Sequence, residues 1–237
     1  MSNPAPVVVA NIKSNQTWEE SQDWINTVGN RAKDFKGTII YCPSYPFLSG
    51  AKQLIDAKAF SIKLGAQDIS KFNGGAYTGA VAASQIKDLV EYAIIGHSER
   101  RKHFGETNEN VFKKVELALE NNITPILCIS DISQLGEYLK KGELLKENWD
   151  KIIFVFEPPS AISGSGEFKP DDPEDANKNA GEITSKIGKN VTTIYGGSIN
   201  DSNVKSFFSQ NNIHGGLVGQ ASVKPDSFLK LIENATI

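Results

Sequence analysis

One apolar run of the chain leads directly into a cluster of chemically active side chains. The run Ala93–Gly96 is followed within five residues by His97, Glu99, Arg100 and Arg101. A histidine and a carboxylate at the end of a strand are suited to proton transfer and to stabilising negative charge that develops on a substrate. We therefore take His97 and Glu99 as candidate catalytic residues, and we expect ion-pairing or interface roles for the two arginines.

A second acid follows a second apolar run. Glu157 comes directly after Ile152–Phe156 and is followed by two prolines. A carboxylate in this position either faces a polar pocket or carries a large desolvation cost. Glu157 and His97 are therefore the candidate acid–base pair.

Three further strand ends carry polar residues or glycines. Asn11 and Lys13 follow the first apolar run, where Lys13 would supply positive potential for an anionic substrate. Backbone amides near Ser198 and in the turn at Gly219 and Gln220 are suited to holding a phosphate group, because glycine permits close approach and amides at a helix start favour negative charge. The glycines of either turn, Gly196–Gly197 before Ser198 or Gly219 before Gln220, are alone typical of the turn after a strand, but the two turns together favour a phosphate site.

The elements that must position these residues alternate along the chain. The expected strands are Val7–Ala10, Thr38–Tyr41, Ile62–Gly65, Ala93–Gly96, Thr124–Ile129, Ile152–Phe156, Thr192–Tyr195 and Gly216–Val218. The first expected helix starts with a capping box of Thr17 and Glu20, and other amphipathic stretches are Glu109–Glu120, Asn200–Phe208 and Pro225–Ile232.

Strands that alternate with helices predict a parallel sheet, and eight uninterrupted units favour its closure into one barrel. We expect an α/β fold, a (β/α)8 barrel formed as a single domain by residues 1–237. The alternative is a doubly wound open sheet. That fold usually carries a glycine-rich G-x-G-x-x-G turn after its first strand, and this chain has Asn11, Ile12 and Lys13 there.

Composition excludes several classes of partner. The 237 residues carry 25 basic and 28 acidic side chains, well mixed, which predicts no binding to nucleic acid or to an anionic membrane. The chain has no apolar run long enough to span a bilayer, and its first residues do not resemble a signal peptide, so we expect a cytoplasmic protein. Cys42 and Cys128 lack C-x-x-C spacing and predict reduced core thiols, not a metal site.

At this point the chain resembles the triosephosphate isomerase family along nearly its whole length. The motifs that carry the resemblance occur in the family's order: N-x-K at residue 11, GAQD at 65, GAYTG at 75, GHSERR-x-x-FGE at 96, FEPP at 156, YGGS at 195 and GGLVGQAS at 215.

The resemblance implies an isomerase that interconverts dihydroxyacetone phosphate and glyceraldehyde 3-phosphate through an enediolate. It implies that Glu157 is the base and that a neutral His97 polarises the carbonyl oxygens. Lys13 would offset substrate charge, Asn11 would help to position oxygen, and Glu99 would organise hydrogen bonds beside Lys13 and His97. No metal or organic cofactor is implied.

The resemblance also implies a closing lid over residues 158–166. An ungapped match makes Ser163 the residue whose amide meets the phosphate, whereas a one-residue insertion would shift that role to Gly164. The sequence departs from the family at the lid, with Ser160 in place of a tryptophan and Phe156 in place of a tyrosine. Gln220 replaces a common second glycine, so it can donate its amide to phosphate only if the backbone there needs no positive φ.

Two features bear on assembly. Asp68–Gly79 resembles the family's long third loop, which reaches into a neighbouring subunit, and we expect a homodimer through it; a simple mobile turn at Asn73–Gly75 is the alternative. Only about twenty residues separate the fifth strand from the sixth, which implies a shortened fifth helix region. That shortening also resembles family members that form tetramers, so a tetramer remains open.

Two other functions compete with the isomerase. One is a barrel that binds phosphorylated ligands or acts as a scaffold without turnover, which the changes at Phe156, Ser160 and Gln220 motivate. The other is a different phosphosugar isomerase or an aldolase. An aldolase that works through a Schiff base needs a lysine, and the absence of one at the end of the sixth strand weakens this hypothesis.

Overall fold

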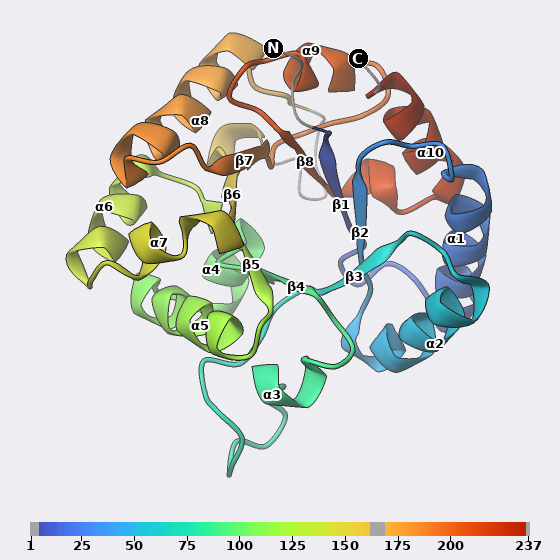
Figure 1. The fold of residues 1–237 in the computed structure, drawn as a ribbon, viewed down its shortest axis with the longest axis horizontal. Coiled ribbons are helices and arrows are strands. Elements are labelled where there is room, and N and C mark those ends of the chain that lie inside the picture. The colour runs from blue at the N-terminus through green and yellow to red at the C-terminus, as the bar shows by residue number, and fades with distance from the viewer. Residues whose placement is uncertain (1–4, 162–168, 236–237) are drawn as a thin grey trace.

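A ring of parallel strands surrounded by helices forms the fold (Figure 1). The computed structural model describes residues 5–161 and 169–235 of the chain. The strands are β1 (Val7–Asn11), β2 (Thr38–Cys42), β3 (Lys63–Ala66), β4 (Tyr92–Ile95), β5 (Thr124–Ile129), β6 (Ile153–Phe156), β7 (Thr192–Tyr195) and β8 (Gly215–Val218). They pair in chain order into a closed barrel.

Closure is visible in the register of the first strand. Val7 pairs with Thr38 of β2 on one side and with Gly215 of β8 on the other. The predicted (β/α)8 barrel is therefore confirmed, and the open doubly wound sheet that competed with it is wrong.

Helices cover the outside of the ring. They are α1 (Trp18–Arg31), α2 (Leu48–Lys58), α3 (Ala83–Ile86), α4 (Ser98–Phe104), α5 (Asn108–Glu120), α6 (Ile132–Lys140), α7 (Leu144–Glu147), α8 (Pro173–Ile187), α9 (Val204–Phe208) and α10 (Pro225–Asn234). The predicted capping box of α1 is confirmed, because the Thr17 side chain accepts from the Glu20 N–H and the Glu20 carboxylate accepts from the Thr17 N–H. Among the described residues, none of the helices combines the length and the apolarity that crossing a membrane would demand.

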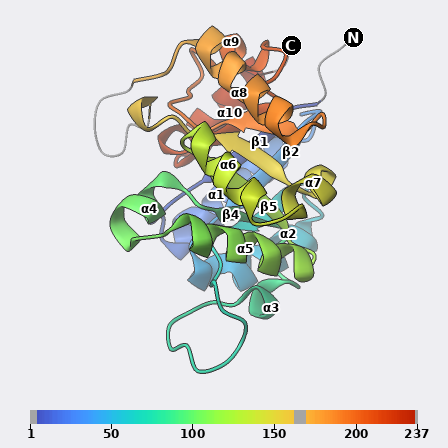
Figure 2. The same cartoon turned by 90° about the vertical axis from the view of Figure 1, so that its left-hand side faces the viewer.

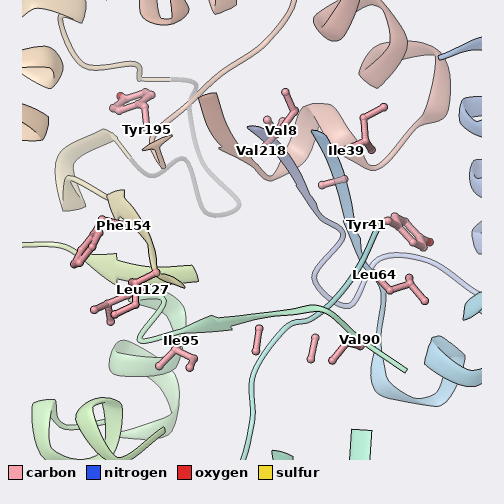
Figure 3. Close-up of a cluster of buried hydrophobic side chains, with 14 of the residues drawn as sticks. Val8, Ile39, Tyr41, Leu64, Val90, Ile95, Leu127, Phe154, Tyr195 and Val218 are labelled. Carbon is pink, nitrogen blue, oxygen red and sulfur yellow. The ribbon is translucent and has the colours of Figure 1, made fainter. Parts of the chain in front are cut away.

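Successive side chains of a strand point to opposite sides of the sheet, and both sides are covered here, so the strands are buried on both faces. One layer fills the space between strands and helices, and Figure 3 shows Tyr41, Phe154 and Tyr195 pointing away from the centre of the ring into it. The other layer fills the barrel and includes Val9 and Ile40. This double burial explains why the strands read as continuous apolar runs.

Two of the differences from the expected boundaries have a clear local cause. The helix expected to start at Asn200 starts at Val204, because the Asn200 side chain accepts from the backbone N–H groups of Ser202 and Asn203 and stabilises a turn instead. The fourth strand ends at Ile95, because Gly96 takes φ +76 and turns the chain out of the sheet.

The connection between β5 and β6 is short, as expected. It contains only α6, with nine residues, and α7, with four, before the chain enters a single 3-10 turn at Trp149–Lys151. The expected shortened fifth helix region is therefore present.

The segment between β3 and α3 extends away from the barrel (Figures 1 and 2). Its middle, residues 72–80, is exposed. Phe72 and Tyr77 stack on each other within it, with ring centroids 4.0 Å apart. The only helix of this connection is the single turn of α3, so β3 is not followed directly by a long helix.

Candidate active site

His97 and Glu157 lie in direct contact, although they belong to different strand ends. Nε2 of His97 is 3.1 Å from Oε1 of Glu157. Both side chains are buried, with residue exposures of 7% for His97 and 0% for Glu157. The acid–base pair expected from the sequence is thus brought together at the carboxyl ends of β4 and β6.

The hydrogen bonds of His97 define which ring nitrogen carries the proton. His97 caps the amino end of α4, where its Nδ1 accepts from the backbone N–H of Glu99 at 3.2 Å. A ring nitrogen that accepts must be unprotonated, so the proton of a neutral imidazole lies on Nε2. The donor nitrogen therefore faces Glu157.

Ser98 orients the Glu157 carboxylate. Its backbone N–H donates to Oε2 and its hydroxyl donates to Oε1, both at 2.9 Å. The backbone of Glu157 is also held, because its N–H donates to the carbonyl of Ile129 at 2.9 Å. The carboxylate consequently has one defined orientation next to β4.

The Cys128 thiol belongs to the layer inside the barrel and interacts with Glu157. It is free, and it is fully buried. Burial first, and then the Glu157 carboxylate, raises the pKa of this thiol. Cys128 is therefore an inert neutral neighbour of the carboxylate and not a nucleophile.

Lys13 and Glu99 form the charged side of the site. Nζ of Lys13 is 2.6 Å from Oε1 of Glu99, and the other Glu99 oxygen is 3.9 Å from Nδ1 of His97. Lys13 also lies against the last strand end, since a Cβ added to Gly219 would be 3.6 Å from Nζ. The Lys13 ammonium group, at the end of β1, therefore lies between Glu99 near the end of β4 and Gly219 at the end of β8.

The backbone of Lys13 is held in an unusual conformation. Its φ of 55° is in the left-handed region, which costs free energy for a residue with a side chain. Its N–H donates to the Asn11 side chain at 3.2 Å, and its carbonyl accepts from Gln67 at 2.8 Å and from Ser44 at 3.3 Å. These three contacts, from β1 and from the ends of β2 and β3, fix the lysine at the barrel mouth.

The expected phosphate-binding turns lie at the ends of β7 and β8. Gln220 begins a 3-10 turn, Gln220–Ser222. Within the described residues, the positive φ values outside glycine belong to Lys13, Ala59 and Asn122. Gln220 therefore satisfies the condition set for an amide donor, and its side chain is exposed.

Ser198 is engaged with the start of the expected lid. Its backbone N–H and its hydroxyl both donate to the carbonyl of Ala161, at 2.9 and 2.8 Å. Ser163, the expected lid contact to phosphate, lies outside the described residues. Ser160, which stands in place of the family's tryptophan, is exposed.

Sequence reasoning assigned no role to two residues that the structure joins to the site, Ser98 and Gln67. Both belong to motifs that carried the family resemblance, GHSERR and GAQD, and both follow a strand end. Their position after a strand end, within a family motif, was therefore the signal that could have marked them as site residues. Their partners, Glu157 and the Lys13 carbonyl, are distant in the sequence and could be identified only from the folded chain.

A sequence model of the family described as Triosephosphate isomerase matches residues 6–235. The chain belongs to the triosephosphate isomerase family. This confirms the resemblance stated from the motifs, and with it the prediction that the chain is an isomerase. The competing interpretation, a different phosphosugar isomerase or an aldolase, is thereby wrong.

Curated relatives support the same family over nearly full length. The triosephosphate isomerase of Mesomycoplasma hyorhinis is 36% identical over 241 residues, which cover 95% of this chain and 97% of the relative. That of Dictyoglomus thermophilum is 36% identical, with 96% and 98% covered. That of Clostridium botulinum is 36% identical, with 95% and 98% covered.

Proposed function

We propose that Glu157 and His97 carry out the interconversion of dihydroxyacetone phosphate and D-glyceraldehyde 3-phosphate, the reaction that membership of the triosephosphate isomerase family assigns to this chain. The single observation that carries the proposal is the 3.1 Å contact between Nε2 of His97 and Oε1 of Glu157 at a barrel mouth that also holds Lys13.

Glu157 acts as the base in this proposal. It takes a proton from C1 of dihydroxyacetone phosphate and returns it to C2, so that no proton is gained or lost overall. The side chain is completely buried and lies next to His97, which places the general base inside the site and away from bulk water. Its contacts with Ser98 keep it oriented before substrate arrives.

His97 stabilises the enediolate. Negative charge develops on the oxygens of C1 and C2 when the proton leaves carbon, and a donor directed at those oxygens lowers the barrier. Nε2 is that donor, because Nδ1 is already occupied by the N–H of Glu99. The proton that shifts between the two substrate oxygens stays within reach of the same nitrogen.

Lys13 supplies positive charge for the anionic substrate and for the enediolate. Its side-chain ion pair with Glu99 and its strained, three-fold anchored backbone hold the ammonium group in place. Asn11, which is also buried, orients the Lys13 backbone, and in this proposal it contacts a substrate oxygen.

The phosphate group is bound by the backbone amides of Ser198, Gly219 and Gln220, with Ser163 contributing from the lid. The amide of Ser198 is bonded to the carbonyl of Ala161 in this structure. Phosphate therefore exchanges with Ala161 at this amide, which couples substrate binding to movement of the lid. No metal or organic cofactor takes part in the proposed mechanism.

The protein assembles as a homodimer through the loop that contains Asp68–Gly79. The exposed aromatic residues of the described chain lie near this loop and define an aromatic surface: Tyr45, Phe72, Tyr77 and Phe104. Exposed aromatic groups of this size are typical of interfaces.

Two members of the aromatic surface, Tyr45 and Phe104, are joined to the start of this loop through Asp68. The Tyr45 hydroxyl donates to the carbonyl of Asp68, Nε of Arg100 lies 2.8 Å from the Asp68 carboxylate, and the Arg100 guanidinium lies over the Phe104 ring, 4.6 Å from its centroid.

The free, buried thiols of Cys42 and Cys128 agree with the cytoplasmic location that we propose.

The decisive experiment measures turnover of both triose phosphates by the purified protein in coupled assays, together with its circular dichroism. We expect interconversion in both directions. A folded protein that binds an inert triose phosphate analogue without turnover would instead support the non-catalytic, phosphate-binding barrel.

A further inference from the structure

The guanidinium group of Arg101 bonds to three different elements with its three nitrogens. Nε donates to the carbonyl of Gly96 at 2.8 Å, at the end of β4. Nη1 donates to the side chain of Asn108 at 2.7 Å, at the start of α5, and Nη2 donates to the hydroxyl of Tyr138 at 2.7 Å, in α6. Arg101 itself lies in α4, so one side chain joins four elements.

The first of these contacts acts on the turn that presents His97. Gly96 has φ +76, and a Cβ added to it would lie 3.0 Å from Nη2 of Arg101. The guanidinium therefore packs against the Gly96 backbone and also binds its carbonyl. His97 and Ser98, which supply every donor to the Glu157 carboxylate described above, are the next two residues.

The other two contacts anchor the guanidinium. The Tyr138 hydroxyl donates onward to Asn108 at 3.2 Å, and Asn108 donates to Glu137 at 2.6 Å. The Tyr138 side chain is 1% exposed, so its position is fixed by packing. A planar guanidinium can satisfy three acceptors in different directions, whereas a lysine offers one compact ammonium group on a flexible stem.

We infer that Arg101 is a positioning residue for the isomerisation: through the Gly96 carbonyl it holds the turn that directs Nε2 of His97 and the two donors of Ser98 at Glu157. The inference rests on the function proposed above. A small displacement of this turn is sufficient to matter, since a misplacement of about 1 Å in a catalytic group costs on the order of 100-fold in rate.

The test compares Arg101→Lys with Arg31→Lys, which makes the same change at an exposed arginine paired with Asp226. We expect Arg101→Lys to lower kcat by about tenfold or more with KM changed less than about twofold, because substrate-binding groups stay in place. The 15N NMR signal of His97 Nε2 should shift in the Arg101 variant only. Arg31→Lys should match the wild type in all three measurements.

Two further variants keep the inference falsifiable if Arg101→Lys does not fold. Tyr138→Phe removes one acceptor of the guanidinium and keeps the ring, so a smaller fall in kcat and a smaller His97 shift are expected. Arg101→Ala should regain part of its kcat when guanidinium chloride is added at millimolar concentration, and ammonium chloride should not restore it.

Unchanged kcat in folded Arg101→Lys would overturn the inference. So would a loss of activity that follows the folded fraction alone while the His97 signal stays at its wild-type position. An inactive wild type would count against the proposed function, but the His97 signal would still decide whether Arg101 positions the ring.

Discussion

Ser98 directs two donors at Glu157, one from its backbone and one from its side chain. The carboxylate is therefore oriented by the residue adjacent to His97, and the two candidate catalytic groups are parts of one hydrogen-bonded unit. A substrate that binds between them must take over contacts that the two residues now make with each other.

Glu157→Gln tests this unit directly. The amide keeps the size of the side chain and one acceptor for Ser98 but cannot accept a proton from carbon. We expect kcat to fall by about 100-fold to 10,000-fold, the range supplied by a general base. Chemical denaturation should show a change in the free energy of unfolding that is small by comparison. Turnover at the wild-type level would remove Glu157 from the mechanism.

The aromatic surface predicts a dimer that a single charge can weaken. Phe104 has 69% of its surface exposed in one chain, and Phe104→Glu would place a carboxylate in the proposed interface. We expect the dissociation constant to rise about 30-fold or more, which corresponds to about 2 kcal/mol for a central interface residue. Light scattering coupled to size-exclusion chromatography measures this. Lys58→Glu, at the end of α2, is the control and should leave the oligomeric state unchanged.

His214 makes stability depend on pH. Desolvation by burial lowers the pKa of this histidine, and the Thr193 carbonyl offsets only part of the effect. The unfolded chain therefore binds a proton more readily than the folded chain, so this contribution to stability is present above the unfolded pKa, about 6.5, and is lost as pH falls below it.

His214→Asn removes that titration and keeps an amide that can bond to Thr193. The unfolding free energy of the wild type should fall more steeply than that of the variant between about pH 7 and pH 5. Urea titrations at several pH values provide the comparison. Parallel pH dependence in both proteins would show that His214 does not contribute.

Ala59 offers a stabilising substitution. It ends α2 with φ 51, a left-handed conformation in which Cβ is strained. Ala59→Gly should raise the free energy of unfolding by about 0.5–1 kcal/mol, because relief of strain exceeds the added flexibility of the unfolded chain. Asn122→Gly is the matched control at φ 57, and its gain should be smaller because asparagine tolerates this region. Thermal or chemical denaturation that ranks the two in the opposite order would contradict this account.

The fold was predictable from the sequence because its signals are local. Doubly buried strands read as apolar runs, and every observed strand lies within one residue of its expected boundaries. The capping box at Thr17 marked the start of α1 in the same way. Local competition also explains a boundary that was wrong, since the Asn200 side chain holds a turn where amphipathic spacing alone suggested a helix.

The identities of the candidate site residues were equally accessible, because polar residues at strand ends stand out from apolar strands. Their partners were not. Ser98 meets Glu157 across 59 positions, and Gln67 meets Lys13 across 54. The hydrogen bonds from Arg101 to Gly96, Asn108 and Tyr138 could not be predicted for the same reason. Such contacts depend on how the barrel closes, and no local pattern specifies them.

The pairing of β1 with β8 has a consequence for the protein during its synthesis. Lys13 follows β1 and is translated before the other seven strands, but Gly219, against which it lies, follows β8. A growing chain on the ribosome exposes the edge of β1 until its final strand emerges, and it has no complete reaction centre before then. We therefore expect activity only after β8 has been translated, and every truncated product that lacks β8 should be inactive.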